Sequence, residues 1–185
     1  ITYPLAGHMQ MALLCVYDGH GTCGEQVSEF VMLKMPDLLE AQIDRIHSDT
    51  ENLFIECFEQ TDRDLKASNV HSEVSGSTGV VVLLTPDQLY TANVGDSRAI
   101  LGRQKGDKVL AIPLTEDQKP DSPLEQARIL SYGGYVSPES KEHGPARVWL
   151  RAGEGPGLAM ARSFGDHMCS HVGVVATPEV KKFNL

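Results

Sequence analysis

Long hydrophobic runs and a signal for export are both missing from this chain of 185 residues. No stretch approaches the roughly 18 consecutive apolar residues of a membrane span, and no basic region followed by an apolar core opens the chain. Hydrophobic residues make up 41% of the sequence and no long polar tract interrupts them, which is typical of a globular domain. We therefore expect a single domain over residues 1–185, without a membrane partner, in the cytoplasm or nucleus.

Positive charge is scarce. The chain has 16 Lys and Arg residues against 25 Asp and Glu, a formal net charge of −9, and its basic residues form no stripe. Because a nucleic-acid backbone has to be neutralised by such residues, we expect no nucleic-acid partner. Where an acidic protein has to bind an anion, divalent cations can reverse the local field. The charge balance thus favours a site that holds metal ions over one lined by arginines. We also expect the protein to be a monomer.

Cysteine is also sparse, and the four cysteines show no Cys-x-x-Cys spacing. So few cysteines in a chain of this length do not build a disulfide scaffold, so we expect reduced thiols. On an extended segment, His167, Cys169 and His171 would lie on one face and offer three zinc ligands. A structural zinc site needs a fourth ligand, which the sequence does not indicate, so zinc is not expected here.

Two long helices are predicted in the first third of the chain. Thr22 and Glu25 have the spacing of a capping box, and so do Ser48 and Glu51. The first helix is expected to begin near Cys23 and to bury Val27, Phe30, Val31 and Met35. The second carries an apolar stripe at spacings of three and four, made of Leu53, Phe54, Cys57, Phe58, Thr61 and Leu65.

The hydrophobic period then changes to that of strands. Residues 80–84 form a short β-branched run, residues 86–87 turn the chain, and residues 89–94 return as a partner strand. A second hairpin is expected from residues 98–102 and 109–112. These short connections favour strands that pair with their neighbours in the sequence.

A third helix is predicted from Ser122 to Gly133, because N-cap, first-turn proline and terminal glycine occupy favoured places. Strands are expected near residues 135–136 and 147–150. Since no βαβ alternation is present, we expect an α+β fold with antiparallel strands in layers.

The segment Asp18-Gly19-His20 follows an apolar run over residues 11–16, where a buried strand leaves the core. At this strand end the Asp18 carboxylate can bridge two ions about 3.5 to 4 Å apart, and the Gly19 carbonyl is a second accessible oxygen. Oxygen ligands alone favour Mg²⁺ or Mn²⁺. The alternative is an Asx-type turn in which Asp18 bonds only its own backbone, and the tripeptide alone leaves both interpretations open.

Five further segments follow in order. They are 75–79 (SGSTG), 94–98 (VGDSR), 114–136 with its EDQKP and GG elements, 158–166 (LAMARSFGD) and 177–180 (TPEV). Together with the Asp18 segment, this series resembles the type 2C metal-dependent serine/threonine protein phosphatases, over about residues 13–180. The resemblance implies an antiparallel β-sandwich with helices packed outside both sheets.

It also implies that residues 1–185 hold a domain that is incomplete at both ends. In this family an Arg and a Glu-Asp pair normally precede the Asp-Gly-His segment, and here they would lie before Ile1. Asp-Gly and Asp-Asn elements normally follow the Pro-Glu-Val segment, and here they would lie beyond Leu185. Gln118 stands where histidine is commoner. The full set of metal-binding acids is therefore not contained in this sequence.

The resemblance also suggests roles for single residues. It implies that His20 protonates the leaving seryl or threonyl oxygen and that Asp96 helps to bind a third, weaker metal ion. From the residues alone, Asp96 can equally cap a turn or pair with Arg98. Arg162 can contact phosphate or peptide near the site, or form a buried ion pair with Asp166 or another acid, which we favour.

The predicted function is hydrolysis of phosphoserine and phosphothreonine in a phosphoprotein substrate, by a hydroxide that bridges two Mg²⁺ or Mn²⁺ ions. The alternative is a non-catalytic phosphatase-like module that binds a phosphorylated or regulatory partner. A third reading is a fragment that has no activity by itself. The upstream and downstream acids of the complete coding sequence distinguish these cases.

Overall fold

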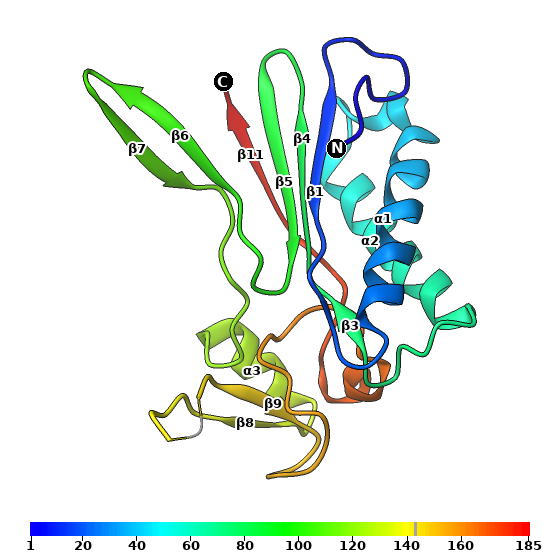
Figure 1. Cartoon of the computed structure of the whole chain (residues 1–185), viewed down its shortest axis with the longest axis vertical. Helices are drawn as coiled ribbons and strands as arrows, with labels where there is room; N and C mark the ends of the chain where they lie inside the picture. The colour runs from blue at the N-terminus through cyan, green and yellow to red at the C-terminus, as the bar shows by residue number, and fades with distance from the viewer. Residues whose placement is uncertain (143) are drawn as a thin grey trace.

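A four-stranded antiparallel sheet forms the centre of the computed structural model, which describes residues 1–142 and 144–185 (Figure 1). The strand order is β1 (Ala12–Val16), β4 (Gly79–Leu84), β5 (Gln88–Val94) and β11 (Glu179–Asn184). The predicted hairpin is confirmed as β4 and β5, which pair antiparallel in full register. Strand β11 was not predicted, because it comes from the far end of the chain to pair with β5.

Strand β5 is covered on both faces. On one face its side chains enter the core beneath the helices. On the other face Thr91 and Asn93 are fully buried and donate hydrogen bonds to the backbone carbonyls of Leu114 and Glu116, at 3.2 and 3.1 Å. Buried polar groups need such partners, so the segment that holds Leu114 and Glu116 allows a central strand to carry polar residues. It also places residues 114–116 over this face of β5.

Helices α1 (Gly24–Glu40) and α2 (Thr50–Ala67) pack against each other on one face of the sheet (Figure 1), with a short 3₁₀ turn, η1 (Ile43–Arg45), between them. The predicted stripe of α2 is confirmed, because all of its residues are buried. On α1 the predicted burial holds for Val27, Val31 and Met35, while Phe30 is only partly buried. No helix within the described ranges is both long and apolar enough to cross a bilayer.

Both predicted capping boxes are wrong. The N-cap residues are Cys23 for α1 and Asp49 for α2, and neither makes a side-chain capping bond. Instead, the Cys23 amide donates to the hydroxyl of Ser75, 52 positions away, at 3.0 Å. A tertiary contact thus replaces the local bond that the spacing predicts, and it ties the start of α1 to the residue before β3 (Gly76–Ser77).

A small second sheet joins segments that are distant in the sequence. Its order is β10 (Phe164–Gly165), β3 (Gly76–Ser77) and β2 (Gly19–His20), all antiparallel. The 3₁₀ helix η2 (His167–Val172) follows β10 directly. This sheet therefore brings the Asp18 segment, the SGSTG segment and the LAMARSFGD segment into contact.

The remaining elements lie on the other side of the molecule (Figure 1). Strands β6 (Ile100–Lys105) and β7 (Lys108–Pro113) form the second predicted hairpin, whose residues are mostly exposed. Helix α3 (Pro123–Ser131) packs beside the pair β8 (Tyr135–Ser137) and β9 (Arg147–Trp149) over a small separate core. The third helix and both late strands are thus confirmed.

The α+β class, with antiparallel sheets and helices, is confirmed. Within the described ranges, helices α1 and α2 cover one face of the four-stranded sheet, and the isolated hairpin β6–β7 is a separate two-stranded sheet. The main core lies between α1, α2 and the sheet. Its lower end, where β2, β3 and β10 pair, carries the candidate site.

Packing of α2 onto the small sheet depends on two stacked rings. Phe58 and Phe164 are both fully buried, with ring centroids 5.1 Å apart. We expect Phe58→Ala to lower the free energy of unfolding by about 3–5 kcal/mol, because it leaves a cavity in the core. Urea unfolding measures this change. The control Leu33→Ala, at a position that is 62% exposed on α1, is expected to stay within about 0.5 kcal/mol of the parent; equal losses for both variants would contradict the packing argument.

Candidate functional site

The Asp18 carboxylate is exposed at the end of β1, and no side chain of the described residues bonds it. Its backbone, by contrast, is held on both sides by Thr78. The Asp18 amide donates to the Thr78 hydroxyl at 3.1 Å, and the Thr78 amide donates to the Asp18 carbonyl at 3.0 Å. The Asx-type turn is therefore not formed. The chain instead presents a charged, unbonded carboxylate on a rigid backbone.

Gly19 and Gly24 allow the turn to lie directly on the start of α1. A Cβ atom at Gly19 would be 2.2 Å from the Gly24 carbonyl oxygen, and one at Gly24 would be 2.6 Å from the Gly19 carbonyl carbon. No real side chain tolerates such distances, so only glycine permits this approach. Helix α1 thereby supports the two residues that the sequence proposed as metal ligands.

His20 makes an ion pair with a buried aspartate. Its Nε2 lies 2.7 Å from Oδ2 of Asp166, and the side chains are 26% and 0% exposed. Burial lowers the pKa of His20, but the hydrogen bond and charge of Asp166, with smaller contributions from Asp18, outweigh it and raise that pKa above its ordinary value. The arrangement therefore favours the charged, proton-carrying form of His20.

Asp166 is the residue that sequence reasoning missed, since it was considered only as a partner for Arg162. It has a left-handed backbone with φ of 49°. Besides His20, the Ser163 hydroxyl donates to its Oδ2 at 2.6 Å, and Oδ1 has no partner among the described residues. The only local signal is the residue type: apart from glycine, aspartate is one of the few residues that adopt a left-handed backbone conformation readily. Nothing in the spacing links it to a histidine 146 positions away.

Asp96 lies at the end of β5 but does not pair with Arg98, so that alternative is wrong. Its Oδ2 is 2.5 Å from Nζ of Lys119, whereas Arg98 makes two hydrogen bonds to Asp117 at 2.9 and 2.8 Å. Gln118 lies between these pairs, and its side-chain oxygen accepts a hydrogen bond from the Gly95 amide at 2.6 Å. The segment 116–120 thus neutralises and positions the Asp96 loop.

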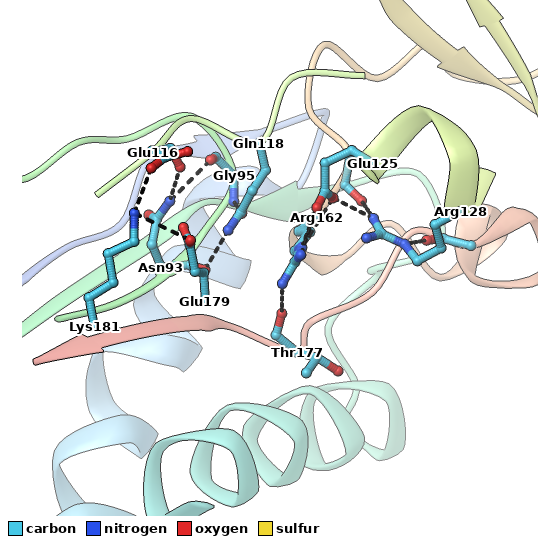
Figure 2. A network of polar contacts seen from close by, with 12 residues as sticks. Asn93, Gly95, Glu116, Gln118, Glu125, Arg128, Arg162, Thr177, Glu179 and Lys181 are labelled. Atoms are coloured by element: carbon cyan, nitrogen blue, oxygen red, sulfur yellow. Dashed lines mark hydrogen bonds and ion pairs between the residues drawn. The ribbon is translucent and has the colours of Figure 1, made fainter. Parts of the chain in front are cut away.

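Arg162 belongs to a structural cluster, seen in Figure 2. Its guanidinium pairs with both oxygens of Glu125 on α3, with a shortest distance of 2.6 Å, and donates to the Thr177 carbonyl at 2.9 Å. Arg128 binds the same carboxylate at 2.6 Å. The predicted ion pair of Arg162 therefore exists, but its partner is Glu125 and not Asp166. The cluster ties α3 to the segment that leads into β11.

The chemistry of the donors near Asp18 fits a hard divalent cation. Asp18 offers a free carboxylate and Gly19 is exposed, and Mg²⁺ is commonly held by one or two carboxylates with several waters retained. Across residues 1–142 and 144–185, no group of three or more His, Cys, Asp or Glu side chains is arranged to hold a metal ion. Asp18 and Gly19 are therefore oxygen donors that could hold such a cation, and the described residues contain no complete metal site.

The segment that holds His167, Cys169 and His171 does not have the extended form that a zinc site was considered for. Residues 167–172 form η2, not an extended segment, so the three side chains do not share a face. Both ring nitrogens of His167 are engaged, with the Ser72 hydroxyl at 2.9 Å and with Asp62 at 3.2 Å. Burial raises the pKa of Cys169 to about 12, which disfavours the thiolate that binds metal.

Comparison with known proteins gives a consistent result. The chain matches the family model described as Protein phosphatase 2C over residues 3–185. It is 36% identical over 196 aligned residues to probable protein phosphatase 2C 72 of Arabidopsis thaliana, covering 100% of this chain and 59% of that protein. It is 38% identical over 185 residues to probable protein phosphatase 2C 61 of the same plant, covering 97% and 56%. The chain thus spans less than two thirds of these relatives.

Solved structures agree on the fold. The crystal structure of a serine-threonine phosphatase 2C from Toxoplasma gondii superposes with a TM-score of 0.81 at 22% identity, over 97% of this chain and 65% of that one. A C. elegans sex determining protein gives a TM-score of 0.74 at 23% identity, over 95% of this chain and 40% of that one. At such identities the likeness concerns the fold alone.

The close packing of Gly19 on Gly24 predicts an unusual effect of alanine. Alanine is favoured over glycine in helices by about 1 kcal/mol, yet we expect Gly24→Ala to lower the free energy of unfolding by roughly 1–3 kcal/mol, because its Cβ meets the backbone of the turn. Chemical denaturation measures it. The control is Gly102→Ala, whose nearest neighbour would be Val109 at an ordinary 3.4 Å. A Gly24→Ala variant as stable as the parent would disprove the constraint.

The Glu125 cluster predicts a loss of stability in acid. Burial raises the pKa of Glu125, but Arg162 and then Arg128 lower it overall, below its ordinary value of about 4.3. The ionised form therefore stabilises the fold fully above that pH, and the contribution is lost as the pH falls through the depressed pKa. Glu125→Gln should cost on the order of 3 kcal/mol at neutral pH, since it removes the buried negative charge that two partly buried arginines share. Urea unfolding between pH 7 and pH 3 should show this difference shrinking in acid, whereas exposed Glu73→Gln should change little at any pH.

Proposed function

The chain belongs to the protein phosphatase 2C family, and on this basis we propose that its protein hydrolyses phosphoserine and phosphothreonine esters in protein substrates. We propose further that Mg²⁺ or Mn²⁺ ions, two or three in number, serve the reaction at the Asp18 turn. The activity belongs to the whole protein, because the chain spans 59% of the length of the relative named first above.

One observation carries the proposal. Among the acids of the candidate site, Asp18 has an exposed carboxylate with no partner among the described residues, while its backbone is bonded on both sides to Thr78. A free carboxylate on a rigid support is what a cation site requires, because the ligand needs no reorganisation when the ion binds. Asp96 and Asp166 are instead paired with Lys119 and His20.

The roles of the residues follow from their chemistry. Asp18, through its carboxylate, and Gly19, through its carbonyl, would hold the ions. When bound, such ions supply a water of lowered pKa and offset the charge of the phosphate. His20 directly follows these ligands in the chain and its ring pairs with Asp166, so it can protonate the seryl or threonyl oxygen as that oxygen leaves phosphorus. Asp18 thus binds and orients, and His20 transfers the proton.

Asp96 has a more conditional role. Its Oδ2 is already paired with the Lys119 ammonium at 2.5 Å, so a third ion at this carboxylate would compete with a positive charge already in place. This competition agrees with a weakly held ion. Arg162 receives no substrate role in the proposal, because Glu125 and the Thr177 carbonyl already engage its guanidinium.

A second candidate function is a non-catalytic module that binds a phosphorylated partner. The two functions differ in a simple way: the catalytic protein releases phosphate from a phosphopeptide, whereas the binding module retains the intact phosphopeptide.

Asp18→Asn tests the proposal in the full-length protein. We expect the variant to lose saturable Mn²⁺ binding by calorimetry and to lose about 100-fold or more of its phosphate release from a phosphoserine peptide, because the carboxylate that holds the ions is gone. Asp107→Asn, an exposed aspartate in the turn between β6 and β7, is the matched control and should leave both unchanged. Full activity of Asp18→Asn would rule out the mechanism.

A further inference from the structure

Asp166 is a buried carboxylate to which the proposed reaction gives no direct part. It is 0% exposed, and its Oδ2 lies 2.7 Å from Nε2 of His20 and 2.6 Å from the hydroxyl of Ser163. Carboxylate oxygens only accept hydrogen bonds, so Nε2 of His20 carries a hydrogen in this contact. The orientation of the ring is thereby set by a group that does not itself reach the surface.

The backbone around Asp166 is held from several sides. Its amide donates to the Ser75 carbonyl at 2.9 Å, and the amide of Gly165 donates to Oδ1 of Asp62 on α2 at 2.8 Å. A Cβ atom at Gly76 would lie only 2.2 Å from Oδ2 of Asp166. Glycine at this position therefore leaves the room in which the carboxylate meets His20. These contacts over-determine a strained, left-handed residue, as is common at functional sites.

We propose that Asp166 is the positioning residue for His20, holding the ring by Nε2 so that Nδ1 is the nitrogen that gives up a proton. The proposal rests on the proton-donor role assigned to His20 above. As the P–O bond breaks, its electron pair stays on the leaving seryl oxygen, which takes the proton from Nδ1. The Nε2 hydrogen stays in its bond to Asp166.

The competing explanation is structural: the pair would merely join β2 to β10, as the Glu125 cluster joins α3 to the chain before β11. Two properties separate these explanations. A positioning residue matters only for substrates whose leaving group needs a proton, and its loss has no further effect once His20 is gone. A purely structural pair would affect every substrate alike.

The experiment uses the full-length protein with Mn²⁺ and two substrates. A phosphoserine peptide has a leaving oxygen that needs a proton, whereas p-nitrophenyl phosphate releases a stable anion. We expect Asp166→Asn to lower kcat for the peptide by about 100-fold with KM changed less than about 3-fold, and to lower kcat for p-nitrophenyl phosphate by less than about 3-fold. The double variant His20→Gln/Asp166→Asn should match His20→Gln alone. The control Asp64→Asn removes an ion pair between Asp64 of α2 and Lys34 of α1, and it should change neither rate.

Equal losses on both substrates, or losses that add to those of His20→Gln, would overturn the positioning role. If His20→Gln leaves the rate on the peptide unchanged, the proton-donor role of His20 fails as well. If His20→Gln lowers that rate but Asp166→Asn does not, only the positioning role of Asp166 is overturned. Should Asp166→Asn fail to fold, ¹⁵N NMR of histidine-labelled parent protein decides the matter. With His20→Gln used for assignment, the His20 signals must show a hydrogen on Nε2, and a bare Nε2 refutes the proposal.

Discussion

Close approach of three short backbone segments is the constraint on which the site depends. Strands β2, β3 and β10 contribute two residues each, and each includes a glycine. Gly76 lies between the other two strands, where any side chain would collide with Asp166. Because the backbones meet without intervening side chains, an aspartate from one end of the chain reaches a histidine near the other.

Pairing of charges then decides which acid is left for a cation. The chain has an excess of acidic residues, yet those around the site are mostly neutralised by a specific base: Asp166 by His20, Asp96 by Lys119, and Glu125 by two arginines. Asp18 is different, since its carboxylate is exposed and has no partner in the described part of the chain. In the proposed function, the unpaired carboxylate of Asp18 would bind the cation and the neighbouring His20 would donate the proton, which together is the chemistry that hydrolysis of a phosphate ester needs.

Local patterns predicted the elements better than their ends. The stripe on α2 and the run that became β4 were read correctly, because burial on one face imposes a period that the residues themselves display. The predicted capping boxes were wrong. At the start of α1, the Cys23 amide donates a hydrogen bond to the distant Ser75 hydroxyl and not to a neighbour in the sequence. The pairing of β11 with β5 and the 3₁₀ form of η2 were not predicted either, because both depend on contacts between distant segments.

The sequence by itself determined the class of fold, the order of the motifs and the identity of Asp18, Gly19 and His20 as site residues to test. Composition, periodicity and motif order are properties of the chain that exist before it folds. Only the tertiary structure decided which acid pairs with which base: Lys119 with Asp96, Glu125 with Arg162, and Asp166 with His20. These partners are 23 to 146 positions apart, and no local spacing encodes a contact that arises when separate strands meet.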